Sequence, residues 1–140
     1  MQPVTATAPA KAILFGEHAV NREQTALAVS VGLYTNCTVA PMPTGFLLVS
    51  SEHVQTTTQG DILSLGKRLD GYRTRHEYEA IQQLVTQDFF APAKYLLAGF
   101  GAALPAGLSA TFTSNIPQSA GLGSGGASFV ALAAAVAALL

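Results

Sequence analysis

The chain has 140 residues, enough for one domain with a hydrophobic core, and 49% of them are hydrophobic while only 11% are charged. This composition excludes an intrinsically disordered chain, and the net charge of −1 gives no reason to expect a nucleic-acid or anionic-membrane partner. So little charge on a small domain suggests that part of its apolar surface meets another domain.

The first half of the chain predicts mostly β-strands. Residues 11–15 predict an early strand that runs into a turn. The alternating segment 25–41 predicts one strand or a pair of strands, with Gly32 as a bend or bulge. Residues 45–60 predict a further strand and a polar hairpin. The segment 60–75 contains three glycines and mixed charges, and it is predicted to be a loop.

The second half predicts helices around one more strand. Apolar residues recur at spacings of three and four over 76–90, which indicates an amphipathic helix. Pro92 is expected to separate it from a second helical stretch, 93–104. The alternation over 107–115 predicts a half-exposed strand, and the Ala-rich run 127–140 predicts a final helix. Together these elements predict one compact α+β domain.

The C-terminal run raises the question of a membrane anchor. From Ala127 to Leu140 it has 14 residues without a charge, whereas a spanning helix needs roughly 20 apolar residues. A buried helix is therefore favoured, and we expect no membrane association. Because no capping signal follows Leu140, we also expect the chain to be part of a longer protein.

The cysteine and histidine residues suggest no redox or metal chemistry. Cys37 is the only cysteine, so no internal disulfide can form, and a single thiol fits a reducing, cytoplasmic setting. Its alternating context favours a packed strand residue over a nucleophile. His53 and His76 match no motif and are expected at the surface, and no Cys/His cluster has metal-ligand spacing.

The segment 117–128, PQSAGLGSGGAS, offers a phosphate site. A Walker A loop is excluded because no lysine follows Lys94. A G-x-G-x-x-G dinucleotide pattern is present, but it does not leave a strand directly and no acidic residue follows at the required distance. Glycines at the start of a helix let the backbone approach an anion, and the free N–H groups there attract it. Ser124 would cap the helix or donate to a phosphate oxygen. An ordinary flexible helix start stays open as the alternative.

Two motifs together resemble the GHMP kinase superfamily. The segment 8–20, APAKAILFGEHAV, resembles its first motif, A-P-G-K-x-x-L-x-G-E-H. The segment 115–128, NIPQSAGLGSGGAS, resembles its second, P-x-x-x-G-L-G-S-S-A, and the order and long gap also agree. The words GEHAV and TALAV look most like the mevalonate kinases, because galactokinases usually continue with Thr-Asp after Gly-Glu-His.

The resemblance implies an α+β, ribosomal protein S5 domain 2-like N-terminal domain over residues 1–140, incomplete at its C-terminal end, with the C-terminal domain absent. It implies ATP-dependent, Mg²⁺-dependent phosphorylation of mevalonate to 5-phosphomevalonate, for isoprenoid precursor synthesis, by a cytoplasmic full-length enzyme. A homodimer of that enzyme is a further expectation. Because the family's catalytic aspartate and Mg²⁺-binding glutamate lie beyond this point, the 140 residues alone are expected to be inactive.

The resemblance also assigns the site residues. Lys11 falls on the motif lysine, near the substrate hydroxyl, where a cation stabilises charge during transfer. Glu17 and His18 fall on the substrate-side loop. The residues implied to line the ATP triphosphate are Pro117, Gly121, Leu122, Gly123, Ser124, Gly125 and Gly126.

Several residues depart from the family pattern. Ala10 replaces a usual glycine, and Ser119 stands where glycine is common. Most important, Gly125 stands where a second serine is expected to help hold Mg²⁺, so Ser124 or Ser128 would have to take that role. Two alternatives therefore remain: a non-catalytic nucleotide-binding relative, and a GHMP kinase for another small alcohol.

Overall fold

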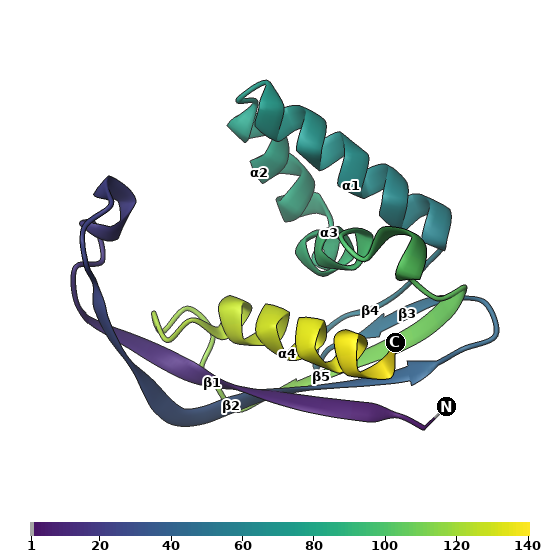
Figure 1. Cartoon of the computed structure of the whole chain (residues 1–140), viewed down its shortest axis with the longest axis horizontal. Helices are drawn as coiled ribbons and strands as arrows, with labels where there is room; N and C mark the ends of the chain where they lie inside the picture. The colour runs from purple at the N-terminus through teal and green to yellow at the C-terminus, as the bar shows by residue number, and fades with distance from the viewer. Residues whose placement is uncertain (1) are drawn as a thin grey trace.

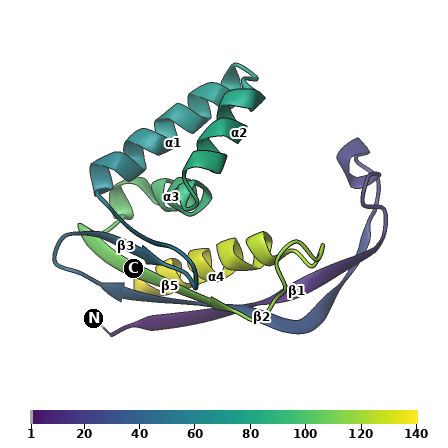
Figure 2. The same ribbon diagram turned by 180° about the vertical axis from the view of Figure 1, so that it is seen from behind.

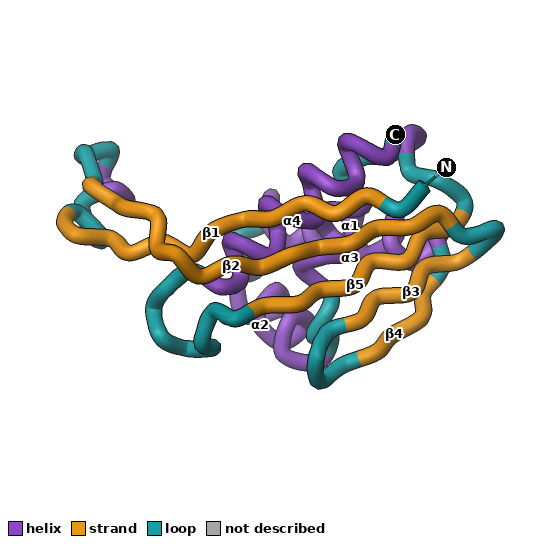
Figure 3. Tube along the Cα trace, turned by 90° about the horizontal axis from the view of Figure 1, so that it is seen from below, coloured by secondary structure: helices purple, strands orange, loops and turns teal. Residues whose placement is uncertain are grey.

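A computed structural model describes residues 2–140, which form a five-stranded sheet with helices over one of its faces (Figure 1). The order of the strands is β1-β2-β5-β3-β4, and β3 runs parallel to β5 while the other neighbours are antiparallel. Figure 3 shows the strands in front of the helices, so the second face of the sheet carries no helix. The predicted α+β class is confirmed. The strands are β1 Val4–Phe15, β2 Leu27–Pro41, β3 Gly45–Val49, β4 Val54–Thr57 and β5 Gly107–Ser114.

Strands β1 and β2 form a long hairpin whose far end projects beyond the rest of the sheet (Figure 1). Pro9 pairs with Tyr34 but Ala10 pairs with Val31, so β2 carries extra residues at this point, Gly32 among them. The predicted irregularity at Gly32 is therefore present. Such a bulge increases the local twist and bends the hairpin toward the face on which the helices lie.

The helices form two groups above the sheet. The helix α4 packs directly on β1 and β2, while α1 packs on α3 with α2 beside them. Pro92 was expected between two helices but lies in the first turn of α3, where a missing N–H costs nothing. No helix in residues 2–140 combines the length and the apolarity needed to cross a bilayer. The helices are α1 Gln59–Thr74, α2 Tyr78–Gln87, α3 Ala91–Ala98 and α4 Ser124–Leu139, with 3-10 turns η1 Val20–Arg22 and η2 Gly101–Ala103.

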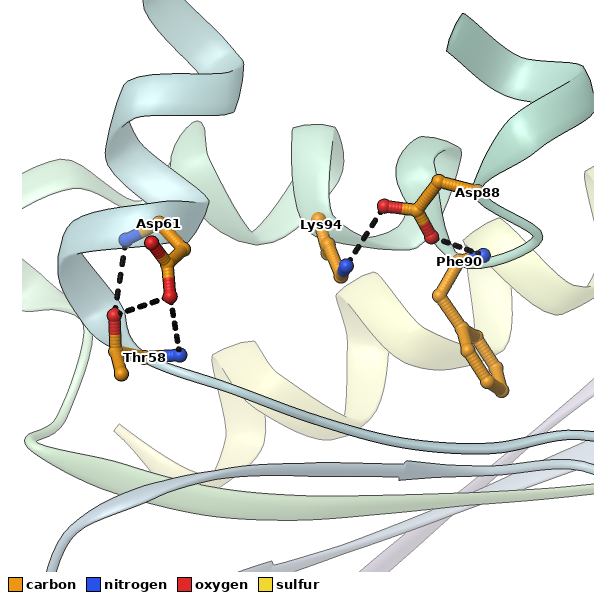
Figure 4. A network of polar contacts seen from close by, with 5 residues as sticks. All are labelled: Thr58, Asp61, Asp88, Phe90 and Lys94. Carbon is orange, nitrogen blue, oxygen red and sulfur yellow. Dashed lines mark hydrogen bonds and ion pairs between the residues drawn. The ribbon is translucent and has the colours of Figure 1, made fainter.

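The prediction of a loop over 60–75 is wrong, because these residues form α1. Thr58 and Asp61 make a capping box: the Thr58 hydroxyl accepts from the Asp61 N–H, and the Asp61 carboxylate accepts from the Thr58 N–H (Figure 4). Gly66 is a packing residue, since a Cβ there would lie 2.6 Å from Cβ of Ala98 on α3. One of the glycines that suggest a loop thus serves close helix packing instead.

The main core lies between α4 and the sheet. On α4 the buried side chains recur at helical spacing, and most of them are small. They meet Ala8 and Ala10 of β1, so small residues on both partners let the helix approach the sheet closely. Larger side chains fill the core under the other helices. The buried α4 residues are Ala127, Ala131, Leu132, Ala135, Val136 and Leu139.

Cys37 is fully buried on β2, as predicted for a packed strand residue, and burial raises the pKa of its thiol to about 12. We expect the folded protein not to react with a thiol reagent at pH 8 and to react fully once denatured. Because the unfolded thiol ionises near its ordinary value of 9.0, the free energy of unfolding should fall as pH rises from 9 toward 12. Rapid labelling of the native protein would contradict this.

Candidate functional site

The loop between β5 and α4 is anchored where it leaves the sheet. The Asn115 N–H donates to the Tyr34 carbonyl at 3.1 Å, and the Asn115 side-chain oxygen accepts from the Tyr34 N–H at 2.7 Å. The next residue, Ile116, is buried and donates its N–H to the Ser114 hydroxyl at 3.1 Å. The first residues of the loop are thus fixed to β2 and β5.

The loop turns into α4 through left-handed residues. Gly121 and Gly123 have φ values of 73° and 71°, and Ser119 has a φ of 57°, which accounts for the glycine that the motif prefers at that position. The helix N-cap is Gly123, with no side-chain cap, so the expectation that Ser124 caps the helix is wrong. The first intrahelical bond is Ala127 N–H to the Gly123 carbonyl, at 3.0 Å. Amides before it are available to an anion.

Lys11 contacts this loop from the other end of the sequence. Its N–H donates to the Leu122 carbonyl at 3.0 Å. Its aliphatic chain lies over Gly123, where an added Cβ would come within 2.9 Å of the Lys11 Cγ. The side chain of Lys11 is otherwise exposed. The lysine of the first motif and the glycine loop of the second are therefore in direct contact.

A pocket of about 410 Å³ opens on the other side of the glycine loop, within the size range of small-molecule sites. The start of α4 forms one wall through Ser124, Gly125 and Ser128. The α2–α3 connection forms the opposite wall, the β3–β4 turn forms the rim, and β2 and β5 form the floor. The residues from these other segments include Thr35, Ser51, Glu52, Phe89, Phe90 and Phe112.

Aromatic rings line the wall opposite the loop. The Phe89 ring stacks on His53 of the β3–β4 turn, with centroids 4.0 Å apart and planes at 9°. Phe90 meets Phe89 edge-on at 5.0 Å and Phe112 of β5 at 6.4 Å. Phe90 is buried, whereas Phe89 is 52% exposed at the pocket mouth. This wall offers apolar faces to a planar ring.

The floor of the pocket is polar. Thr35 is fully buried, and its hydroxyl lies 2.8 Å from the Ser114 hydroxyl. On α4 the Ser128 hydroxyl donates to the Ser124 carbonyl at 3.0 Å, so its proton is already committed while its lone pairs remain. The pocket thus combines aromatic walls with hydroxyl groups and helix amides.

Of the residues that the motifs imply for the site, only Ser124, Gly125 and Ser128 line this pocket. Glu17 and His18 are exposed in the turn at the tip of the β1–β2 hairpin, which Figures 1 and 2 show curving toward the helices. Pro117 is exposed in the loop and does not line the pocket. His53 and His76 are exposed, as predicted. Within residues 2–140 no three His, Cys, Asp or Glu side chains gather as metal ligands.

The aromatic wall could not be predicted from the sequence. Phe89 and Phe90 stand at the end of the predicted amphipathic helix, where the sequence places them with its apolar residues. His53 matched no motif. They meet only because α3 brings the α2–α3 connection over the β3–β4 turn, a contact between residues far apart in the chain.

Residues 87–140, which include α3, β5, the glycine loop and α4, match the family model of the GHMP kinases N terminal domain. The C-terminal part of the chain is thus similar to the N-terminal domain of the GHMP kinases. The strands β1 and β2, which pair with each other and with β5, lie outside the matched residues.

Solved structures share the fold of this chain over nearly its whole length. Mevalonate kinase of Methanococcus jannaschii superposes with a TM-score of 0.70 at 19% identity, covering 99% of this chain and 40% of that one. A galactokinase of Lactococcus lactis, complexed with galactose, gives 0.68 at 14%, covering 94% and 31%. A mevalonate pyrophosphate decarboxylase of Streptococcus pyogenes gives 0.56 at 14%, covering 99% and 37%.

These similarities establish the fold of the chain and leave its substrate open. The three proteins carry different names, and each is less than a fifth identical to this chain. The chain spans only 40%, 31% and 37% of their lengths. No curated protein sequence matches the chain. The residues of the site itself therefore have to indicate which activity this chain supports.

Proposed function

We propose that this chain is the ATP-binding part of a kinase that phosphorylates a small alcohol, with mevalonate as substrate and 5-phosphomevalonate as product. The observation that supports it is the contact between Lys11 and the glycine loop: its N–H donates to the Leu122 carbonyl, and its aliphatic chain fills the space where Gly123 has no Cβ. A cation is thereby held beside a helix N-terminus with free amides. Anion binding and charge stabilisation during phosphoryl transfer both need that arrangement.

The residues present fit a nucleoside triphosphate. Gly121 and Gly123 expose the backbone, and the amides of Ser124, Gly125 and Gly126 precede the first bond of α4. The pocket on one side of the loop takes the base against Phe89 and Phe90, while Lys11 lies on the other side. Bound ATP supplies the phosphoryl group. The protein holds the phosphates at the loop and places a positive charge where the acceptor hydroxyl arrives.

Mg²⁺ fits this part of the chain only in part. Ser124 offers a hydroxyl at the loop, and Ser128 offers lone pairs one turn later. Mg²⁺ in proteins usually takes one or two carboxylates together with substrate phosphates. Residues 2–140 gather no such carboxylate cluster. We propose that the carboxylates come from the remainder of the full-length enzyme, which would also bring the acceptor to Glu17 and His18.

Direct binding and transfer measurements test the proposal. We expect the chain to bind ATP and inorganic tripolyphosphate in calorimetric titrations, with ATP bound more tightly because of the pocket. We expect the full-length gene product to transfer radiolabelled phosphate from ATP to mevalonate and not to galactose. If neither ATP nor tripolyphosphate binds, the nucleotide site is refuted. Transfer to another alcohol alone would refute mevalonate.

Gly125 favours a second candidate, a nucleotide-binding relative without transferase activity, because glycine lacks the hydroxyl that the motif has there. A Cβ at Gly125 would meet no atom within 4 Å, so Gly125→Ser fits without rearrangement. We expect the variant to be more stable by about 0.5 kcal/mol, since serine is a better helix former than glycine. If the full-length wild-type protein does not transfer phosphate from ATP to mevalonate and Gly125→Ser restores this transfer, the second candidate is correct. Gly125→Ala is the control, because it stabilises the helix without a hydroxyl.

A further inference from the structure

Three residues join α2 to α3: Asp88, Phe89 and Phe90. The two phenylalanines carry the aromatic wall of the pocket, and Asp88 forms a part-buried ion pair with Lys94 of α3. Asp88 closes the turn into α3: its carbonyl accepts from the Ala91 N–H at 2.9 Å, and its Oδ1 accepts from the Phe90 N–H at 3.1 Å. The conformation of the connection, and with it the direction of both rings, therefore depends on where the Asp88 carboxylate is held.

Lys94 holds that carboxylate. Its Nζ lies 2.7 Å from Asp88 Oδ2, as Figure 4 shows, and its side chain is only 8% exposed. Lys94 belongs to the next turn of α3, and its N–H donates to the Phe90 carbonyl at 2.9 Å. The Asp88 carboxylate is thus held by the Phe90 N–H through one oxygen and by Lys94 of α3 through the other.

Burying an ammonium group is costly, and an apolar side chain of similar volume would serve the core of α1, α2 and α3 as well or better. Lys94 lines a small pocket of mixed character together with Asp61, Ser64, Leu65, Arg68 and Asp88. Leu65 also belongs to a buried apolar cluster between these helices, with Leu69 and Ala91. What the pair adds is a fixed direction for the two rings that face the glycine loop.

We infer that Asp88 and Lys94 are positioning residues for the base of the bound nucleotide. They set the place of Phe89 and Phe90 across the pocket from Ser124 and Gly125, and so determine how tightly a base stacks. This inference rests on the proposed function. The pair touches neither the phosphates nor Lys11, so it affects the base and leaves the phosphate loop alone.

The test compares two ligands on Lys94→Met, which removes the cation and keeps a long apolar side chain. We expect ATP binding to weaken about tenfold, as for one misplaced stacking contact, and tripolyphosphate binding to stay within about twofold of wild type. Lys94→Arg should restore ATP binding. Arg75→Met breaks an exposed ion pair with Glu77 at 2.8 Å, away from the pocket, and should change neither.

The outcomes separate the inference from the function on which it rests. Loss of ATP binding alone, with rescue by Lys94→Arg, supports it. Wild-type ATP binding by Lys94→Met overturns it, and so does a parallel loss of ATP and tripolyphosphate, which indicates general destabilisation. A wild-type chain that binds neither ligand overturns the proposed function and this inference together. If Lys94→Met does not fold, the double variant Asp88→Asn, Lys94→Met takes its place, with the same expected results, because it leaves no unpaired charge and keeps the acceptor for the Phe90 N–H.

Discussion

Replacing Gly123 by alanine should abolish binding of both ATP and tripolyphosphate, with affinity reduced about 100-fold or more. Gly123 has a φ of 71°, which costs an alanine about 1–2 kcal/mol, and the new Cβ would lie 2.9 Å from the Lys11 Cγ. To relieve that contact the loop or Lys11 must move. Either movement disturbs the oriented amides, and two lost charge-assisted hydrogen bonds account for the expected factor. Calorimetric titration measures it.

Gly121→Ala is the matched control for this prediction. Its φ of 73° imposes the same backbone strain, but a Cβ there meets no atom within 4 Å. It should lower stability by about 1–2 kcal/mol and weaken tripolyphosphate binding far less than Gly123→Ala does. Equal losses in the two variants would mean that the contact with Lys11 has no part in the site. Unchanged binding by Gly123→Ala would remove the loop from the proposal altogether.

Removing Asp88 should cause the largest loss of stability among the polar side chains discussed. Asp88→Ala leaves the Lys94 ammonium almost buried without its partner at 2.7 Å, and it removes the acceptor for the Phe90 N–H. The expected loss is about 3–5 kcal/mol, a large part of the stability of a domain of this size. Urea unfolding followed by circular dichroism measures this loss.

The double variant Asp88→Ala, Lys94→Met shows whether the loss of stability in Asp88→Ala comes from the unpaired ammonium group of Lys94. With no charge left to bury, most of the stability should return, because buried ion pairs contribute little beyond an apolar pair of similar shape. Glu77→Ala breaks the exposed pair with Arg75 and should have little effect. If Asp88→Ala is as stable as the double variant, Lys94 does not depend on Asp88.

The comparison of α1 and α2 shows how far the sequence predicts the helices. The apolar spacing of α2 predicted it correctly, although none of its residues is fully buried. The segment of α1 has the same kind of spacing at Ile62, Leu65 and Leu69. Its three glycines nevertheless led to the prediction of a loop. Gly66 belongs there only because Ala98 of α3 lies against it, and no local pattern contains that contact.

The sequence by itself determined the local features of this protein: the alternating strands, the glycine loop before an Ala-rich helix, and the two motifs that indicate a GHMP kinase. These follow from residues close together in the chain, whose backbone preferences and periodicity act locally. Only the tertiary structure decided that Lys11 lies on Gly123, that His53, Phe89 and Phe90 form one wall, and that Lys94 holds Asp88. The first two depend on strand register and helix packing between distant segments. The third depends on the turn between two helices that only their packing fixes.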